Sequence, residues 1–371
     1  MICYYYNVNN MEKIDINRYI ERMDRSRANH IKEMKKIITI PSPRWLNPKF
    51  KLSLHSVELP LGFSSDIIDF VQTGLQTIRG VSKNPKARLG VLLSGGVDSS
   101  VVLQAGYNAV GRDNLVALTI DHYMIGEQER QDNKKRDNLV SRLGIEEVKQ
   151  DITPLVKAEL EIMISLPETR RLFEKRPELF EIYRAEAVSR ARVLAMLNYC
   201  SLEDIYPIDT GNLTESALGQ CTIGDSSGFL ISILSPLLKG EVRKLGKDLG
   251  LGKEYYEQEK RTGEFNCVGN EQLGAEDSYL DPIVHLYLSG KNFEEIAEKT
   301  GHDENWLKNL GERIEGKARI VRATNSPIVN LEEVSIIPDF RSLWQSKIKD
   351  RNGLHYKLHQ KRQTYMPRSE K

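Results

Sequence analysis

The chain has 371 residues, 40% of them hydrophobic, so it is long enough to bury a large core. Its 53 basic and 52 acidic residues leave a net charge of +1, which argues against a protein that coats nucleic acid. No apolar run approaches the roughly 20 residues of a membrane span, and the N-terminus lacks a signal-peptide pattern, so we expect a cytoplasmic protein with small-molecule partners.

Residues 1–60 are predicted to form an N-terminal extension of the main domain. A charged segment over residues 14–34 favours a helix, and the prolines that follow it indicate a break. The predicted main domain covers residues 61–330, and a basic tail follows at 331–371. Within the tail, residues 341–371 carry nine Lys or Arg and two Asp or Glu, so it can contact RNA, an acidic protein surface or only solvent.

Apolar strands alternate with helices through the main domain. This order predicts an α/β fold with a mostly parallel, doubly wound sheet covered by helices on both faces. Ligands of such sheets bind beyond the carboxyl ends of the strands. We predict strands at residues 89–93, 115–120, 147–151 and 205–210, and helices at 65–79, 99–110, 127–143, 183–199 and 241–249.

A glycine turn joins the first predicted strand to the helix after it. Gly95 and Gly96 lack a Cβ atom, so their backbone N–H groups can approach an anion closely. The N-terminus of the helix adds positive charge, and Ser94, Ser99 and Ser100 add hydroxyl groups. This combination is typical of a loop that holds phosphates.

Two acidic residues follow predicted strands. Asp98 lies in the first turn of the helix after the glycine turn, where a carboxylate beside phosphates suits a Mg²⁺ ligand. Glu215 lies in the first turn of a second helix, after the strand at 205–210 and a Gly-Asn turn. Mg²⁺ accepts one or two carboxylates and leaves its other positions to phosphates and water. The alternative for both residues is an ordinary role at a helix N-terminus.

The motif from Ser94 to Ser99 resembles the pyrophosphate loop of the N-type ATP pyrophosphatases. The sequence Thr210-Gly-Asn-Leu-Thr-Glu215 resembles the segment that closes the ATP site in NAD synthetases. The resemblance implies an adenine nucleotide alpha hydrolase-like fold and a ligase that adenylates the carboxylate of deamido-NAD. Ammonia would then form the amide, with release of AMP and pyrophosphate. ATP as co-substrate, Mg²⁺ held by Asp98 and Glu215, and a homodimer are also implied.

Further positions match the same family. Lys239 precedes a helix, like the family lysine that reaches the phosphates, and Arg192 matches the first of two family arginines, the second being Leu194 here. The resemblance assigns catalysis to Asp98, Glu215 and Lys239, and contacts with the acceptor to Arg192 and Asp225. It assigns ATP binding to Ser94, Gly95, Gly96, Val97, Asp98, Ser99, Ser100, Arg192, Thr210, Lys239 and Thr262.

The acceptor and the nitrogen source stay open. The extension is too short for the glutaminase domain of the larger NAD synthetases, so ammonia must be free or come from a separate glutaminase. Ser232-Ile-Leu stands where the family usually has Asn-Pro-Ile, which keeps another carboxylate acceptor possible. Thiolation of a tRNA base, with Cys221 as the sulfur carrier, is a lesser version of this alternative.

A non-catalytic nucleotide sensor or nucleic-acid-binding regulator is the alternative from another class. Two helices predicted at residues 293–301 and 304–314 could imitate a helix-turn-helix, although NAD synthetases also have a helix pair here. The presence of both Asp98 and Glu215 speaks against a pure sensor, which has little need of a metal pair.

Overall fold

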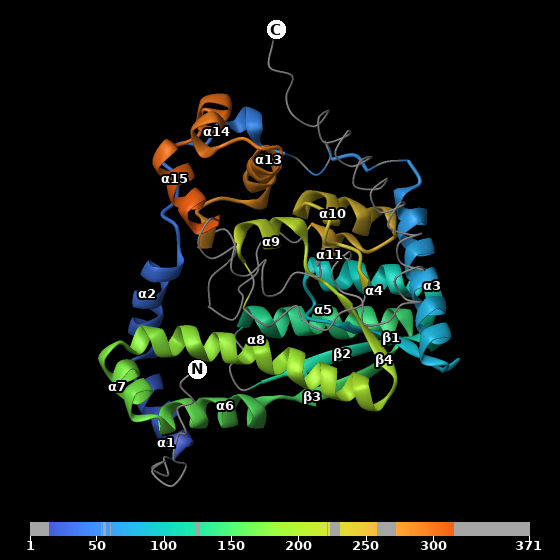
Figure 1. Ribbon diagram of the computed structural model, residues 1–371, viewed down its shortest axis with the longest axis horizontal. Coiled ribbons are helices and arrows are strands. Elements are labelled where there is room, and N and C mark those ends of the chain that lie inside the picture. The colour runs from blue at the N-terminus through green and yellow to red at the C-terminus, as the bar shows by residue number, and fades with distance from the viewer. Residues whose placement is uncertain are drawn as a thin grey trace, which may run out of the picture.

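A sheet of five parallel strands lies at the centre of the protein (Figure 1). The computed structural model describes residues 15–52, 54, 57–59, 61–122, 127–220, 222, 231–257 and 272–314. The strand order is β3-β2-β1-β4-β5. The strands are β1 (Arg88–Leu92), β2 (Leu115–Asp121), β3 (Glu146–Asp151), β4 (Ile205–Asp209) and β5 (Ile231–Ser232).

The order of the strands reverses between β1 and β4. The chain passes from β1 outward to β2 and β3, and then returns to the other side of β1 as β4 and β5. Leu89 is therefore paired with Leu115 on one side and with Tyr206 on the other. In open α/β sheets ligands bind beyond the carboxyl ends of the strands at such a reversal. The loops that follow β1 and β4 both start at this edge.

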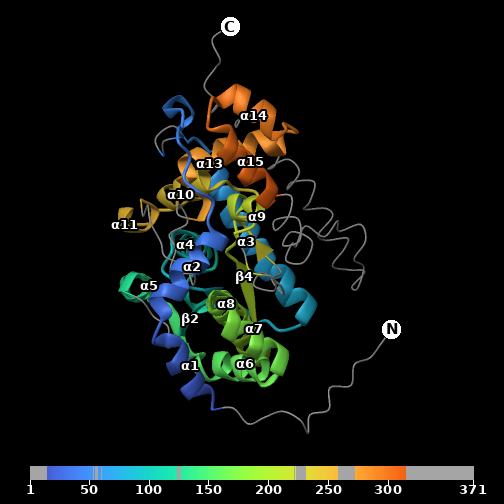
Figure 2. The ribbon, with the colours of Figure 1, turned by 90° about the vertical axis from the view of Figure 1, so that its left-hand side faces the viewer.

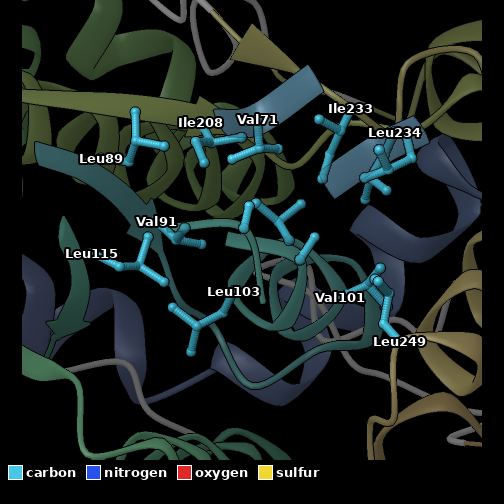
Figure 3. Close-up of a cluster of buried hydrophobic side chains, with 14 of the residues drawn as sticks. Val71, Leu89, Val91, Val101, Leu103, Leu115, Ile208, Ile233, Leu234 and Leu249 are labelled. Carbon is cyan, nitrogen blue, oxygen red and sulfur yellow. The ribbon is translucent and has the colours of Figure 1, made fainter. Parts of the chain in front are cut away.

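Both faces of the strands β1, β2 and β4 are largely buried, as is usual for parallel sheets covered by helices, whereas the edge strand β3 is partly exposed. Along β2, Leu115 and Ala117 point into one core and Val116 and Leu118 into the other, because successive side chains of a strand face opposite sides. Figure 3 shows the first core, where strand residues meet α4. The helices of this face are α3 (Phe63–Ser82), α4 (Val97–Val110), α5 (Glu127–Leu143) and α10 (Lys239–Asp248), and those of the other are α6 (Thr153–Ser165) and α8 (Pro177–Leu202).

The predicted α/β fold and its strands and helices are confirmed, with shifted ends at most of them. The described part of the segment predicted as a helix at 14–34 forms two helices, α1 (Ile16–Asp24) and α2 (Arg27–Ile38), which are separated by a turn. Four of the described helices were not predicted: α6, α7 (Pro167–Lys175), α11 (Lys253–Tyr256) and α13 (Asp277–Leu288). The predicted domain boundaries at residues 60 and 330 stay a prediction.

The N-terminal segment contacts the main domain at both ends of the molecule. Figures 1 and 2 show α13 to α15 at one end and α1, α6 and α7 at the other. At the end that holds α1, the side chains of Ile16 and Tyr19 pack in one core cluster with residues of α6 and α8. At the opposite end, residues 38–52 run along the C-terminal helices. These helices are α13 (Asp277–Leu288), α14 (Phe293–Thr300) and α15 (Glu304–Arg313).

Backbone hydrogen bonds hold this segment in place. Pro282 lies inside α13 and cannot donate to the carbonyl of Ser278, and the N–H of Leu52 donates to that oxygen instead at 2.8 Å. Ile40 and Trp306 lie in the same core cluster beside α13 to α15. The N-terminal segment therefore completes the hydrogen bonding of a helix more than 200 residues away in the sequence.

The helix pair predicted at 293–314 is confirmed as α14 and α15. α15 buries Trp306, Leu307 and Leu310 in the core cluster, and the indole N–H of Trp306 donates to the carbonyl of Leu273 at 2.7 Å. This face of α15 is therefore buried in the protein core.

Among the described helices, none is long and apolar enough to cross a membrane.

His302 should make the stability of the protein depend on pH. The ring is 4% exposed, its Nδ1 accepts the N–H of Asn47 at 3.0 Å, and burial lowers its pKa to about 4. The His302 imidazole therefore takes up a proton near pH 6.5 in the unfolded chain but only near pH 4 in the folded protein. The contribution of His302 to stability is complete well above pH 6.5, and about 2 kcal/mol of that contribution should be lost between pH 7.5 and 5.

Urea unfolding of the wild type and of His302→Asn at the two pH values measures this term. The asparagine keeps an acceptor for Asn47 and does not titrate, so the variant should lack this part of the pH dependence. An equal loss in both proteins would show that other groups are responsible.

Candidate active site

The loop after β1 requires glycine at position 95. Gly95 has φ +78°, and a Cβ atom built there would lie 2.2 Å from the backbone oxygen of Asp132 on α5. No side chain fits in that space, and non-glycine residues rarely adopt this backbone conformation. The loop therefore lies directly against the backbone of α5.

The serines of the loop hold it in a compact shape. The N–H of Ser94 donates to Ser99 Oγ at 3.2 Å, and the two hydroxyl oxygens are 3.0 Å apart. Ser99 Oγ also lies 3.3 Å from the carbonyl of Gly96, which is the N-cap residue of α4. Within the described residues, the buried hydroxyl of Ser100 has no hydrogen-bond partner. A helix N-terminus capped by glycine leaves its N–H groups for an anion.

Two carboxylates and one ammonium group meet at this helix N-terminus. Lys239 Nζ lies 2.5 Å from Asp98 Oδ2 and 2.9 Å from Glu215 Oε1. The three residues come from the first turns of α4, α9 (Leu213–Leu218) and α10. The structure thus brings together the acid pair and the lysine that the sequence indicated, although 141 residues separate Asp98 from Lys239.

Asn212 links the two acidic residues, a role that the sequence did not reveal. Its side-chain oxygen accepts the N–H of Glu215 at 3.0 Å and so caps α9. Its side-chain nitrogen donates to Asp98 Oδ1 at 2.9 Å, and the residue is fully buried. Its position in the Gly-Asn turn after β4 is the sequence signal for this residue, because asparagine is a preferred N-cap of helices.

The charges of this cluster depend on one another. Burial alone would lower the pKa of the Lys239 ammonium, but Asp98 and Glu215 together raise it above its usual range. Burial raises the pKa of Glu215, and repulsion from Asp98 adds to the shift while Lys239 opposes it. A second cation beside the two carboxylates would therefore be favoured electrostatically.

The carboxyl end of β4 is shaped by a buried acid. Asp209 accepts the N–H of Gly211 at 3.1 Å and the hydroxyl of Ser232 on β5 at 3.0 Å, and burial raises its pKa. Thr210 lies in the same turn, partly exposed. Ser232, one of the departures from the family pattern, therefore joins β5 to the turn that precedes Asn212.

Arg192 lies on α8, where its Nη2 is 2.9 Å from Nε2 of His122. His122 is buried and directly follows β2, at the carboxyl edge of the sheet. His122 is not among the residues predicted from the sequence. Asp225, Thr262 and Cys221 lie outside the described residues.

The geometry defines a class of protein. The described residues form an α/β protein with a parallel sheet whose glycine loop, at a helix N-terminus and beside an acid pair at the reversal of strand order, suits the phosphates of a nucleotide. The family model for NAD synthase matches residues 67–319. The chain belongs to the NAD synthase family, whose members are ligases that form a carbon–nitrogen bond.

Known relatives are similar at modest identity. The NH3-dependent NAD(+) synthetase of Chlorobaculum parvum is 24% identical over 197 residues, which cover 53% of this chain and 65% of that relative, slightly less than two thirds of its length. The NH3-dependent NAD(+) synthetase of Methanocaldococcus jannaschii is 28% identical over 209 residues, 56% of this chain and 76% of the relative. The solved NMN synthetase of Francisella tularensis has a TM-score of 0.55 at 19% identity and covers 76% of this chain and all of that chain, a likeness of fold.

Proposed function

We propose that the protein is an ATP-dependent amide ligase that converts the carboxylate of deamido-NAD to an amide with ammonia. The observation that carries the proposal is the meeting of Asp98, Glu215 and Lys239 at the N-terminus of the helix that follows the glycine loop. In such folds the phosphates of a nucleotide bind at this helix N-terminus, so the position of the two anions and the cation supports the proposal. Membership of the NAD synthase family supports the amide-forming reaction.

The proposed reaction has two steps. The substrate carboxylate attacks the α phosphate of ATP, forming an acyl-adenylate and releasing pyrophosphate. Ammonia then attacks the acyl carbon, and AMP leaves with the former carboxylate oxygen. The chain's own residues position the reactants and offset charge, with no covalent bond to the protein.

Each residue of the cluster has a proposed role. The N–H groups of the glycine loop, with Ser94 and Ser99, would hold the leaving pyrophosphate, and Lys239 would neutralise part of its charge. Asp98 and Glu215 would hold Mg²⁺, which when bound neutralises phosphate charge. Two carboxylates that already share one cation suit this ion, which takes its other ligands from phosphates and water.

The remaining expectations are proposals of the same kind. Arg192 and Asp225 would contact the acceptor, and Thr210 and Thr262 would contact ATP. We also propose residues 61–330 as the catalytic domain, a homodimer, a cytoplasmic location, and ammonia that is free or supplied by a separate glutaminase. The resemblance to NAD synthetases supports the residue roles, the catalytic domain and the homodimer.

Pyrophosphate release from ATP in the presence of Mg²⁺ and ammonium tests the acceptor. Three reactions are compared: with deamido-NAD, with nicotinate mononucleotide, which is the acid corresponding to NMN, and with a mixture of unrelated carboxylates. We expect release that requires deamido-NAD and yields NAD in equal amount. Release that requires nicotinate mononucleotide or another carboxylate would overturn the proposed acceptor while leaving the ATP chemistry in place.

A further inference from the structure

A buried acid on α13 connects the two helices that carry Glu215 and Lys239. Asp281 is 1% exposed, and its Oδ1 accepts the hydroxyl of Thr214 at 2.6 Å. Its Oδ2 accepts the N–H of Gly240 at 2.7 Å. The hydroxyl oxygen of Thr214 in turn accepts the N–H of Lys239 at 3.0 Å. These three bonds form one closed network between α9, α10 and α13.

The N-terminus of α10 needs such a network because its N-cap residue is Leu238, which has no side-chain acceptor. Three backbone N–H groups at the start of α10 donate to side-chain oxygens of three different residues. The N–H of Leu238 is taken by Glu241, that of Lys239 by Thr214, and that of Gly240 by Asp281. The start of α10 is therefore fixed by residues outside that helix as well as by its own.

The close approach of Asp281 depends on the glycine at position 240. A Cβ atom built on Gly240 would lie 3.1 Å from Asp281 Oδ2 and 3.4 Å from a methyl carbon of Val57. A larger residue would have to push the carboxylate or the N-terminal segment away. The sequence Lys239-Gly240 thus places the ammonium group and the backbone N–H bound by Asp281 on adjacent residues.

We infer that Asp281 and Thr214 are positioning residues that set the separation of Glu215 and Lys239. Thr214 is adjacent to Glu215 in α9, and the network holds the backbone of Lys239 through the same hydroxyl. Asp281 acts through Thr214 and the backbone of α10. The inference rests on the proposed function, because the separation matters for the charge that develops on the leaving pyrophosphate.

Thr214→Val tests the inference, and Thr214→Ser is the matched control. Valine has nearly the shape of threonine but no hydroxyl, so it breaks two of the three bonds, whereas serine keeps both. We expect the kcat of pyrophosphate release to fall about 100-fold in Thr214→Val, because small misplacements of catalytic groups have effects of this size. The KM for ATP should change less than about threefold, and Thr214→Ser should stay within about threefold of the wild type in both constants.

Hydrogen exchange in the absence of substrates gives a second measurement that does not depend on the reaction. The backbone N–H groups of Lys239 and Gly240 should exchange slowly in the wild type and in Thr214→Ser, and about tenfold faster or more in Thr214→Val. Asp281→Asn, which replaces one acceptor oxygen by a donor, should also speed exchange at Gly240 and supplies the test if Thr214→Val does not fold.

The outcomes separate this inference from the proposed function. A wild type that is inactive with every acceptor would refute the proposed function. The hydrogen-exchange rates would still test whether the hydrogen-bond network fixes the start of α10. An active wild type with an unchanged kcat in Thr214→Val would overturn the inference, even if that variant were less stable. Fast exchange at Lys239 and Gly240 in the wild type would overturn it as well.

Discussion

Asp98→Asn is expected to lower the rate of pyrophosphate release by about 1000-fold, near the upper end of the effect of removing one preorganised electrostatic group. The substitution keeps the size of the side chain but removes the negative charge of the Asp98 carboxylate. This carboxylate contacts Lys239 and accepts a hydrogen bond from the side-chain amide of Asn212. In the proposed site the substitution also removes one of the two Mg²⁺ ligands. Single-turnover measurement of pyrophosphate release, with ATP and deamido-NAD in excess over their binding constants, isolates this effect from substrate binding.

Asp113→Asn is the matched control for this variant. The Asp113 side chain is 90% exposed and lies 3.6 Å from Arg112. The substitution therefore changes an aspartate to an asparagine at a position away from the cluster. We expect it to leave the rate unchanged. A rate for Asp98→Asn within about threefold of the wild type would contradict the role assigned to Asp98.

Gly95→Ala is expected to abolish ATP binding at concentrations where the wild type is saturated. The new methyl group cannot occupy a position 2.2 Å from the carbonyl of Asp132, so the loop must move away from α5. Movement of the loop displaces the N–H groups that would hold the phosphates, and we expect affinity to fall about 100-fold or more. Isothermal titration of ATP with Mg²⁺ measures the change.

Gly250→Ala separates this clash from backbone strain. Gly250 has φ +85°, so alanine there meets the same conformational penalty of about 1–2 kcal/mol, but nothing lies within 4 Å of the added Cβ. The control should lose stability and keep its affinity for ATP. Equal loss of affinity in both variants would show that general destabilisation, and not the loop, is responsible.

The sheet could be predicted because each central strand is a short apolar run between loops. The prediction was accurate at β2, β3 and β4, where only one end moved by one residue. It was poor between β3 and β4, where α6 and α7 were missed and α8 was started six residues late. All three helices have a proline in their first turn, which is a sequence signal for the start of a helix.

The candidate site could be predicted where its residues follow strands. Asp98 and Glu215 each lie in the helix turn after a strand of the parallel sheet, so their approach to each other follows from the fold. The contributions of His122 and Asp281 could not be predicted. Their contacts join elements that are distant in the sequence, and α13, which carries Asp281, interrupts the usual helix signal with Pro282. The functional roles of all these residues stay predictions.

Transfer of oxygen from the acceptor to AMP tests the central claim most directly. Deamido-NAD labelled with ¹⁸O in its nicotinate carboxylate is converted with ATP, Mg²⁺ and ammonium, and the products are examined by mass spectrometry. If the carboxylate attacks the α phosphate, the AMP carries one ¹⁸O atom and the pyrophosphate carries none. Unlabelled AMP, or label in pyrophosphate or inorganic phosphate, would contradict adenylation of the acceptor and with it the proposed function of this site.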